Sequence, residues 1–316
     1  MGFFVLLPLV LPLTSWPVAR LTERNLHPRT ATWLLLTLGT VLAVCSTLCL
    51  WLLVVVGTAQ LPGNPLPDEW SDPEVRAAVP YDMLLGMASL PALAAVLVSC
   101  GRTLSRHLRV QRQVRRSLEG LPHSTVAVLP DEAPYAFALP AGRREPARVV
   151  VSTAMLDALT PDERRALLAH ERAHLAARHH RLLLLAELAA HANPFLLPLR
   201  TAVAFGVERW ADEEAARRVA DRRLTARAVG KAALIARDGP TRTVPAVSGG
   251  GQVPRRVQAL LTPAPTTRVW DLPATPSGLL AGLATWLAAA GAATSALSSA
   301  NAAIALVLIL QAATPL

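Results

Sequence analysis

The chain has few cysteines and almost no lysine. Cys45, Cys49 and Cys100 lie in apolar stretches and one of the three necessarily lacks a partner, so they form neither a disulfide framework nor a zinc-binding set. Lys231 is the only lysine among 31 lysines and arginines. The formal charge of +9 raises the question of nucleic acid, but the arginines gather beside apolar stretches, without a recognised DNA-binding motif. We therefore expect this charge to face a lipid bilayer, and we expect no direct nucleic-acid partner.

Charged side chains are missing from two long internal runs. Residues 33–57 and 83–100 contain none, and each run is close to the roughly 20 residues that cross a bilayer. A hydrophobic content of 52% and a mean hydropathy of +0.37 are also high for a soluble protein of 316 residues. Both runs are predicted to be transmembrane helices.

Both ends of the chain are uncharged as well. Residues 1–19 carry no charge, and Pro8, Pro12 and Pro17 predict a kinked helix there. Because a basic region typical of a cleaved signal peptide is missing, we interpret this segment as a third, uncleaved span. No charged residue follows Asp271. We expect this tail to cross the bilayer once, although two short helices would also fit it.

The distribution of arginine predicts the orientation in the membrane. Residues 20–29 contain three arginines and residues 102–116 contain six, whereas residues 58–82 contain five acidic residues and one arginine. Cytoplasmic loops carry the excess of basic residues. The N-terminus is therefore predicted to lie outside, and the part of the chain after residue 100 in the cytoplasm.

A helix is predicted to begin near residue 161. Thr160 is a favourable N-cap, Pro161 fits the first turn, and Glu163 completes a capping box. An apolar pair at residues 167–168 follows at once. This helix carries the motif His-Glu-x-x-His.

His170, Glu171 and His174 form that motif. Residues four apart lie one above the other on a helix, so both imidazoles can bind one Zn²⁺ while Glu171 points to the open face of the metal. Taken alone, the histidines also fit hydrogen-bonded core or surface positions, and Glu171 fits a solvated acidic face. The interpretation as a catalytic zinc site depends on a third ligand.

Two residues compete for the third position. His180 imitates an extended motif in which a glycine turns the chain, but Ala177 stands at the glycine position and no methionine follows. If the helix continues, His180 faces away from the metal. Glu208 lies on another predicted helix, four residues before Asp212. We favour Glu208 as the ligand and Asp212 as the acceptor of a hydrogen bond from a ligating histidine, although the two acids also fit an ordinary acidic helix face.

The segments AHERAH, NPF at residues 193–195, ERWADEEAA and PRRVQALL span roughly residues 125 to 262. In these segments the sequence resembles the gluzincin metallopeptidases, and specifically the membrane-embedded BlaR/MecR-type antirepressor peptidases. The resemblance implies a Zn²⁺ site of His170, His174 and Glu208, with Glu171 as general base and Asp212 supporting the ligands. It also implies a protein substrate, with a cytoplasmic transcriptional repressor as the example. In gluzincins the edge of a small sheet holds extended substrate by strand addition.

The chain departs from this family in two respects. Many members carry an acidic residue five positions after the second histidine ligand, where this chain has His179. Sensor-transducers of the family also carry an extracellular antibiotic-binding domain after the last span, whereas this sequence ends at Leu316. We therefore do not expect a β-lactam sensor.

The predicted organisation has three parts. Residues 1–100 hold three transmembrane helices, residues 101–262 form a cytoplasmic zinc metallopeptidase domain, and residues 263–316 form a linker and a C-terminal transmembrane segment. The middle part begins with an arginine-rich helix at 101–118, followed by strands at 125–129, 135–139 and 148–152. The expected fold is thus a mainly α, multi-pass membrane protein with a cytoplasmic α+β minigluzincin-like zinc peptidase domain.

Two connecting segments have alternative interpretations. Residues 182–199 fit a buried core helix and turn, and they fit equally a hairpin that touches the bilayer, with Asn193 and Pro194 starting the next helix. Residues 239–254 are rich in Gly, Pro, Ser and Thr and predict a linker, with a lid over the site as the alternative.

The expected function is a membrane-embedded zinc metalloendopeptidase that cleaves a cytoplasmic or membrane-proximal protein. The alternatives are a quality-control protease for membrane proteins and a non-catalytic signalling scaffold with a structural zinc. Cleavage also needs a group that stabilises the oxyanion. The candidates for that role are His179, His180, His191, Arg217 and Arg222.

Overall fold

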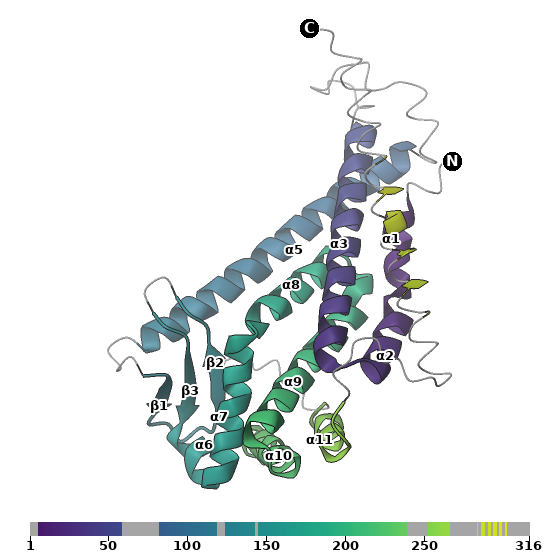
Figure 1. Ribbon diagram of the computed structural model, residues 1–316. Coiled ribbons are helices and arrows are strands. Elements are labelled where there is room, and N and C mark those ends of the chain that lie inside the picture. Colours follow the sequence, from purple (N-terminus) through teal and green to yellow (C-terminus); the bar gives the residue numbers. More distant parts are fainter. Residues whose placement is uncertain are drawn as a thin grey trace.

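The computed structural model is mostly helical, with one small sheet (Figure 1). It describes residues 6–58, 82–118, 124–142, 145–238 and 252–265, together with separate helical positions between 283 and 301. The predicted acidic loop and most of the linker at 239–254 lie outside these residues, as does most of the expected C-terminal span. The mainly helical character predicted from the sequence is confirmed.

The N-terminal segment is helical but interrupted. It comprises α1 (Leu7–Val10), the 3-10 helix η2 (Leu11–Thr14) and α2 (Ser15–Asn25). Pro8 and Pro12 stand at the starts of α1 and η2, where a missing N–H is tolerated. The expected kink at the prolines therefore takes the form of two short helices before α2.

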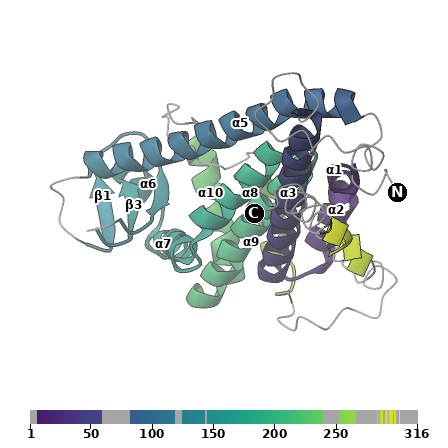
Figure 2. The ribbon, with the colours of Figure 1, turned by 90° about the horizontal axis from the view of Figure 1, so that it is seen from above.

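Two of the described helices are long and apolar enough to cross a membrane: α3 (Pro28–Thr58) and α5 (Asp82–Ser117). Half of the most apolar stretch of α3 is buried inside the protein, whereas only 11% of the most apolar stretch of α5 is buried. Along its length α5 exposes large apolar side chains: Leu84, Met87, Leu90, Leu97, Val98, Leu104 and Leu108. Seen from above, α5 runs across the molecule from α3 to the sheet (Figure 2).

The sheet has the strand order β1-β3-β2. Its strands are β1 (Val126–Leu129), β2 (Ala136–Leu139) and β3 (Arg148–Ser152), close to the predicted bounds. The central strand β3 is buried throughout, pairing parallel to β1 and antiparallel to β2. Leu118, just after α5, packs against Ala127, Leu139 and Val150 of the sheet. β2 is left as an edge strand, and it lies beside α7.

Six further helices complete the described fold: α6 (Thr153–Ala158), α7 (Pro161–Ala176), α8 (His179–Ala192), α9 (Leu197–Val219), α10 (Arg222–Asp238) and α11 (Val253–Leu261). The predicted capping box of α7 is present, because Thr160 and Glu163 exchange hydrogen bonds. The last of these helices, α11, begins at the end of the segment 239–254 that was predicted as a linker or lid, and it packs on α9 and α10.

Helices α3, α8 and α9 share one hydrophobic core. Leu35 and Leu42 of α3 lie in the same buried cluster as Leu182 of α8 and Val207 of α9. The predicted boundary after residue 100 falls inside the continuous helix α5. The segment that carries the predicted site is therefore packed directly against α3.

The connection between α8 and α9 is a tight hairpin. Asn193 accepts a hydrogen bond from the Phe195 N–H and starts the 3-10 helix η4 (Pro194–Leu196), as predicted. The Asn193 amide also donates to Ser46 Oγ on α3 at 3.0 Å. Leu196 is buried, whereas Phe195 and Leu197 are about half exposed. The hairpin therefore has features of both alternatives considered for it: one face is buried in the core, and its tip exposes apolar side chains.

Candidate metal centre

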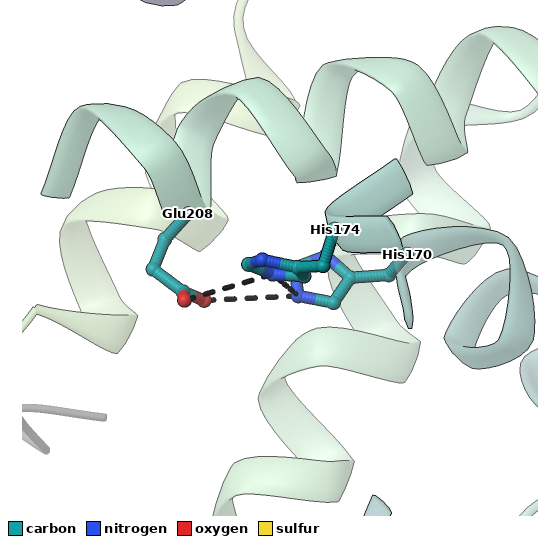
Figure 3. Close-up of side chains that lie close together, drawn as sticks. All are labelled: His170, His174 and Glu208. Atoms are coloured by element: carbon teal, nitrogen blue, oxygen red, sulfur yellow. Dashed lines mark hydrogen bonds and ion pairs between the residues drawn. The ribbon is translucent and has the colours of Figure 1, made fainter. Parts of the chain in front are cut away.

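Two helices in contact, α7 and α9, bring the predicted ligands together. His170 and His174 project from α7 on one side, and Glu208 projects toward them from α9 (Figure 3). The Nε2 atoms of the histidines are 3.1 Å apart. Glu208 Oε2 lies 3.7 Å from His170 Nε2, and Glu208 Oε1 lies 3.7 Å from His174 Nε2. In the part of the chain that the structure describes, no other group of three histidine, cysteine or acidic side chains lies close enough together to hold a metal ion.

The geometry of the three donors fits one zinc ion. Zinc prefers tetrahedral sites of imidazole and carboxylate ligands with bonds of about 2.1 Å, which separates neighbouring ligand atoms by about 3.4 Å. The observed separations of 3.1 and 3.7 Å lie on either side of this value. Two histidines and one carboxylate also leave a fourth position for a reacting molecule.

A close approach of two helices places Glu208. Gly206 lies two residues earlier on α9, and a Cβ atom there would be 2.6 Å from Thr32 Oγ1 on α3. Thr32 is fully buried and donates to the Pro28 carbonyl. A Cβ atom at this position would force Thr32 or one of the two helices to shift, so the packing of α3 helps to set the position of the third donor.

Asp212 supports the first histidine. Its Oδ1 atom lies 3.0 Å from His170 Nδ1, so the Nε2 atom of the same ring is left to face the other two donors. Asp212 is 2% exposed. Burial opposes its charge, but hydrogen bonding and attraction from Arg256 hold its pKa below the usual range. The structure therefore places Asp212 where the sequence predicted a supporting carboxylate.

Arg256 is a residue of the site that the sequence did not reveal. From α11 its Nε and Nη2 atoms each donate to Asp212 at 2.8 Å, and its Nη1 atom lies 2.8 Å from Glu208 Oε2. Burial disfavours the charged guanidinium, but Asp212 outweighs this and raises its pKa. The basic helix PRRVQALL was predicted, but nothing in its pattern connected Arg256 with carboxylates more than 40 positions earlier.

His179, five positions after His174, lies against the second histidine of the motif. α7 ends at Ala176, and Arg178 in the left-handed conformation turns the chain into α8. His179 is thereby fully buried, with its Nδ1 atom 3.0 Å from His174 Nδ1 and its ring against Trp210. Burial lowers the pKa of His179 to about 3, so its ring is neutral and can accept the Nδ1 hydrogen of His174.

Glu171 lies beside the three donors. Its side chain is nearly buried, and burial raises its pKa to about 7, with His170 and Glu208 acting on it in opposite directions. The backbone N–H of Ala138, on edge strand β2, also acts on this carboxyl as a hydrogen-bond donor. A carboxyl with a pKa near neutrality is suited to exchange protons during a reaction.

The other titratable groups differ in protonation. Burial lowers the pKa of His174 to about 4 despite the attraction of Glu208. Burial also opposes the charge on His170, but Asp212 and Glu208 outweigh it and raise the pKa of His170 to about 10. Burial likewise opposes the charge on Glu208, but His174 and His170 outweigh it and lower the pKa of that carboxyl.

The residues considered as alternatives lie elsewhere. His180 is half-buried, and its pKa is lowered to about 4 by burial, with Arg181 and His107 of α5 adding to the effect. His180 is not part of the cluster formed by His170, His174 and Glu208. The turn at Arg178 brings His179 inward instead. The remaining oxyanion candidates have other partners: His191 contacts Ser99, Arg217 contacts Glu214, and Arg222 contacts Glu213 and the last carbonyls of α11.

Comparison with known proteins supports a metallopeptidase. Residues 102–197 match the sequence model of peptidase family M48, a family of metal-dependent peptidases. The match covers the second half of α5, the sheet, α7 and α8, and it ends before Glu208. No curated protein and no solved structure matches the chain.

Proposed function

We propose that this protein is a membrane-bound zinc endopeptidase with the ligands His170, His174 and Glu208. The observation that carries the proposal is the convergence of these three donors from α7 and α9 at separations expected for one zinc ion. The match of residues 102–197 to peptidase family M48 supports the same chemistry independently of the geometry.

The exposed faces of the long helices support a location in the membrane. A buried core helix would cover its apolar side chains, yet α5 leaves Leu84 71% and Leu97 62% exposed. On α3, Trp33, Val44 and Trp51 are also about half exposed. Contiguous apolar surface of this kind is typical of contact with lipid or with a partner protein. We propose that α3 and α5 cross the bilayer, with α7 to α11 on the cytoplasmic side as the arginine distribution predicts.

Glu171 is the proposed general base. Zinc bound by the three donors supplies a Lewis acid that polarises the scissile carbonyl and acidifies a water molecule. Glu171 accepts the proton of the attacking water and delivers it to the leaving amine. Its raised pKa suits both transfers. Asp212 orients the ring of His170 through the Nδ1 atom of that ligand. His179 orients the ring of His174 in the same way.

The free edge of β2 is the proposed substrate platform. β2 pairs with β3 on one side, and its other side borders α7, where the Ala138 N–H reaches the Glu171 carboxyl. An extended peptide added to this edge would pass directly beside the general base. Backbone hydrogen bonds would then supply affinity that does not depend on the substrate's side chains.

We propose a dedicated cytoplasmic or membrane-proximal protein as the substrate, with a transcriptional repressor in a signalling relay as the example. This finer assignment rests on the resemblance to BlaR/MecR-type peptidases. A quality-control peptidase would use the same site on many misfolded membrane proteins. Substrate breadth in cells that carry wild type or Glu171→Gln separates the two: one accumulating protein supports the relay, and many support quality control.

The zinc site can be tested on the full chain purified in detergent. Elemental analysis and cleavage of a denatured protein would be measured for wild type, Glu171→Gln and Glu208→Ala. We expect wild type to hold about one zinc and to cleave, Glu171→Gln to hold zinc without cleaving, and Glu208→Ala to lose both. Full zinc binding by Glu208→Ala would overturn the ligand assignment. Zinc binding without cleavage in all three proteins would favour a structural zinc.

A further inference from the structure

A groove between α5 and α8 lies outside the metal centre. It has a volume of about 510 Å³. Six of its lining residues come from α5 and one, His191, comes from α8: Ala94, Ala95, Val98, Ser99, Arg102 and Thr103. We call it the α5–α8 groove. Neither the proposed mechanism nor the family match assigns it a role.

The lining changes from apolar to polar along α5. Ala94, Ala95 and Val98 belong to the uncharged run that ends at residue 100. Arg102 and Thr103 follow directly, at the start of the arginine-rich half of the helix. From Ala94 to Arg102 the helix rises about 12 Å. The groove therefore runs from the apolar layer to the cytoplasmic interface, in the order of an acyl chain followed by a headgroup.

Arg102 is the one arginine that lines the groove, and it has no acidic partner among the described residues. Glu187, four positions before His191 on α8, is paired both with Arg200 and, at 3.4 Å, with His191 Nε2. His191 Nδ1 in turn contacts Ser99 Oγ at 2.6 Å. Among the described residues no carboxylate pairs with Arg102, whose side chain is exposed. The groove thus ends in an arginine and a hydroxyl that can both donate to an anion.

We propose that the α5–α8 groove binds one anionic phospholipid, with its phosphate at Arg102 and Thr103 and an acyl chain over Ala94, Ala95 and Val98. Basic residues beside a membrane helix on the cytoplasmic side attract anionic lipid headgroups. This proposal rests on the proposed insertion of α5 in the bilayer. Because α8 begins at His179, a lipid that fixes α5 against α8 also stabilises the end of α8 that contacts the metal centre.

Lipid binding would be measured by native mass spectrometry and thermal unfolding of the delipidated full chain in neutral detergent. The probes are phosphatidylglycerol, phosphatidylcholine and soluble glycerol phosphate. Arg102→Gln removes the headgroup contact, and Arg102→Lys retains the charge. Arg106→Gln is the matched control, since it removes the same charge from an exposed position on the same helix that does not line the groove. Val98→Trp fills the groove at a side chain that is 50% exposed.

We expect phosphatidylglycerol to bind wild type, Arg102→Lys and Arg106→Gln and to raise their unfolding temperatures. We expect at least tenfold weaker binding to Arg102→Gln and to Val98→Trp. Equal loss in Arg102→Gln and Arg106→Gln, or equal binding of phosphatidylcholine, would overturn the proposal. Binding of glycerol phosphate as tight as that of the lipid would identify a free phosphate site and also overturn it.

The outcome is separable from the proposed peptidase function. Zinc content and cleavage of a denatured protein are expected to stay at wild-type levels in Arg102→Gln, because Arg102 contacts none of the zinc donors. Extraction of the protein from membranes by alkaline carbonate would refute the insertion of α5 directly. A failed lipid assay with a carbonate-resistant protein would refute the lipid site alone.

Discussion

Arg256 and Asp212 form a bidentate pair in the interior of the protein, although 44 positions separate them. Both side chains are nearly buried, and the third guanidinium nitrogen reaches Glu208. The pair joins α11 to α9, the helix that carries Glu208, the third proposed metal donor. Docking of α11 therefore supports two carboxylates of the metal centre, Glu208 and Asp212.

Replacement of Arg256 by glutamine is expected to weaken zinc binding about 10- to 100-fold, because Asp212 and Glu208 lose the group that orients them. Leaving Asp212 buried without its partner should also lower the free energy of unfolding by about 3–5 kcal/mol. Chelator competition and thermal unfolding check both effects. Arg255→Gln is the control, since Arg255 pairs with Glu23 and covers the Phe205 ring. Equal effects in the two variants would contradict a specific role for Arg256.

His179→Leu is expected to weaken zinc binding by about 10-fold or more, because His174 loses the acceptor that fixes its ring. The neighbouring variant His180→Leu should bind zinc like wild type, since His180 lies outside the donor cluster. Zinc affinity is measured by competition with a chromophoric chelator. A stronger effect of His180→Leu would restore His180 as a ligand candidate.

Removal of the metal should leave the chain folded but inactive. The core that joins α3, α8 and α9 contains no zinc donor, so we expect chelator-treated protein to keep its helical circular dichroism while cleavage is lost. Added zinc should restore cleavage in wild type but not in Glu171→Gln, whose activity should stay about 10²- to 10⁴-fold lower. Loss of helical signal on chelation would show that zinc has a structural role.

Gly206→Ala is expected to destabilise the protein by about 1–3 kcal/mol through overpacking against Thr32. Gly39→Ala lies on the same pair of helices, but its Cβ would meet Leu199 at an ordinary 3.5 Å. That control should be neutral or slightly stabilising, since alanine favours a helix by up to about 1 kcal/mol. Thermal unfolding ranks the variants. Matching behaviour of the two alanines would remove the argument for close α3–α9 contact.

The capping box of α7 predicts a pH-dependent stability. The backbone N–H of Thr160 lowers the pKa of Glu163 in the fold, with Lys231 adding to this effect against burial. Its contribution is therefore complete above the unfolded pKa and disappears as the pH falls through the lower folded value. Glu163→Gln should lose about 0.5–1 kcal/mol at pH 7 and little at pH 3.

Denaturant unfolding of wild type and Glu163→Gln at the two pH values checks this expectation. Asp162→Asn is the control, because Asp162 is exposed and pairs only with Arg165 among the described residues. A difference between wild type and Glu163→Gln that stays constant from pH 7 to pH 3 would exclude the carboxylate as its source.

Local signals in the sequence predicted the elements of the fold well. The capping box at Thr160 and the cap at Asn193 placed two helix starts, and short β-prone runs between Pro and Gly turns placed all three strands. The four-residue spacings of His170 with His174 and of Glu208 with Asp212 placed each pair on one helix face. Each of these features depends on residues only a few positions apart, so the sequence alone is enough to predict it.

Long-range packing could not be predicted in the same way. The pairing of Arg256 with Asp212 depends on how α11 docks, and the inward turn of His179 depends on a left-handed residue, Arg178, for which no glycine or asparagine gave a signal. The common core of α3, α8 and α9 was also missed, because hydropathy marks a span without showing what its other face contacts.

The continuity of α5 has a mechanical consequence. Its 36 residues make a rod of about 54 Å, with an apolar part that contains Pro91 and a distal end fixed to the sheet through Leu118. Helices respond to a change in bilayer thickness by tilting. Over this length a tilt of about 5° moves the far end by about 5 Å. With α5 inserted in the bilayer as proposed, stretching or thinning of the membrane would act through α5 as a force on the strand beside Glu171.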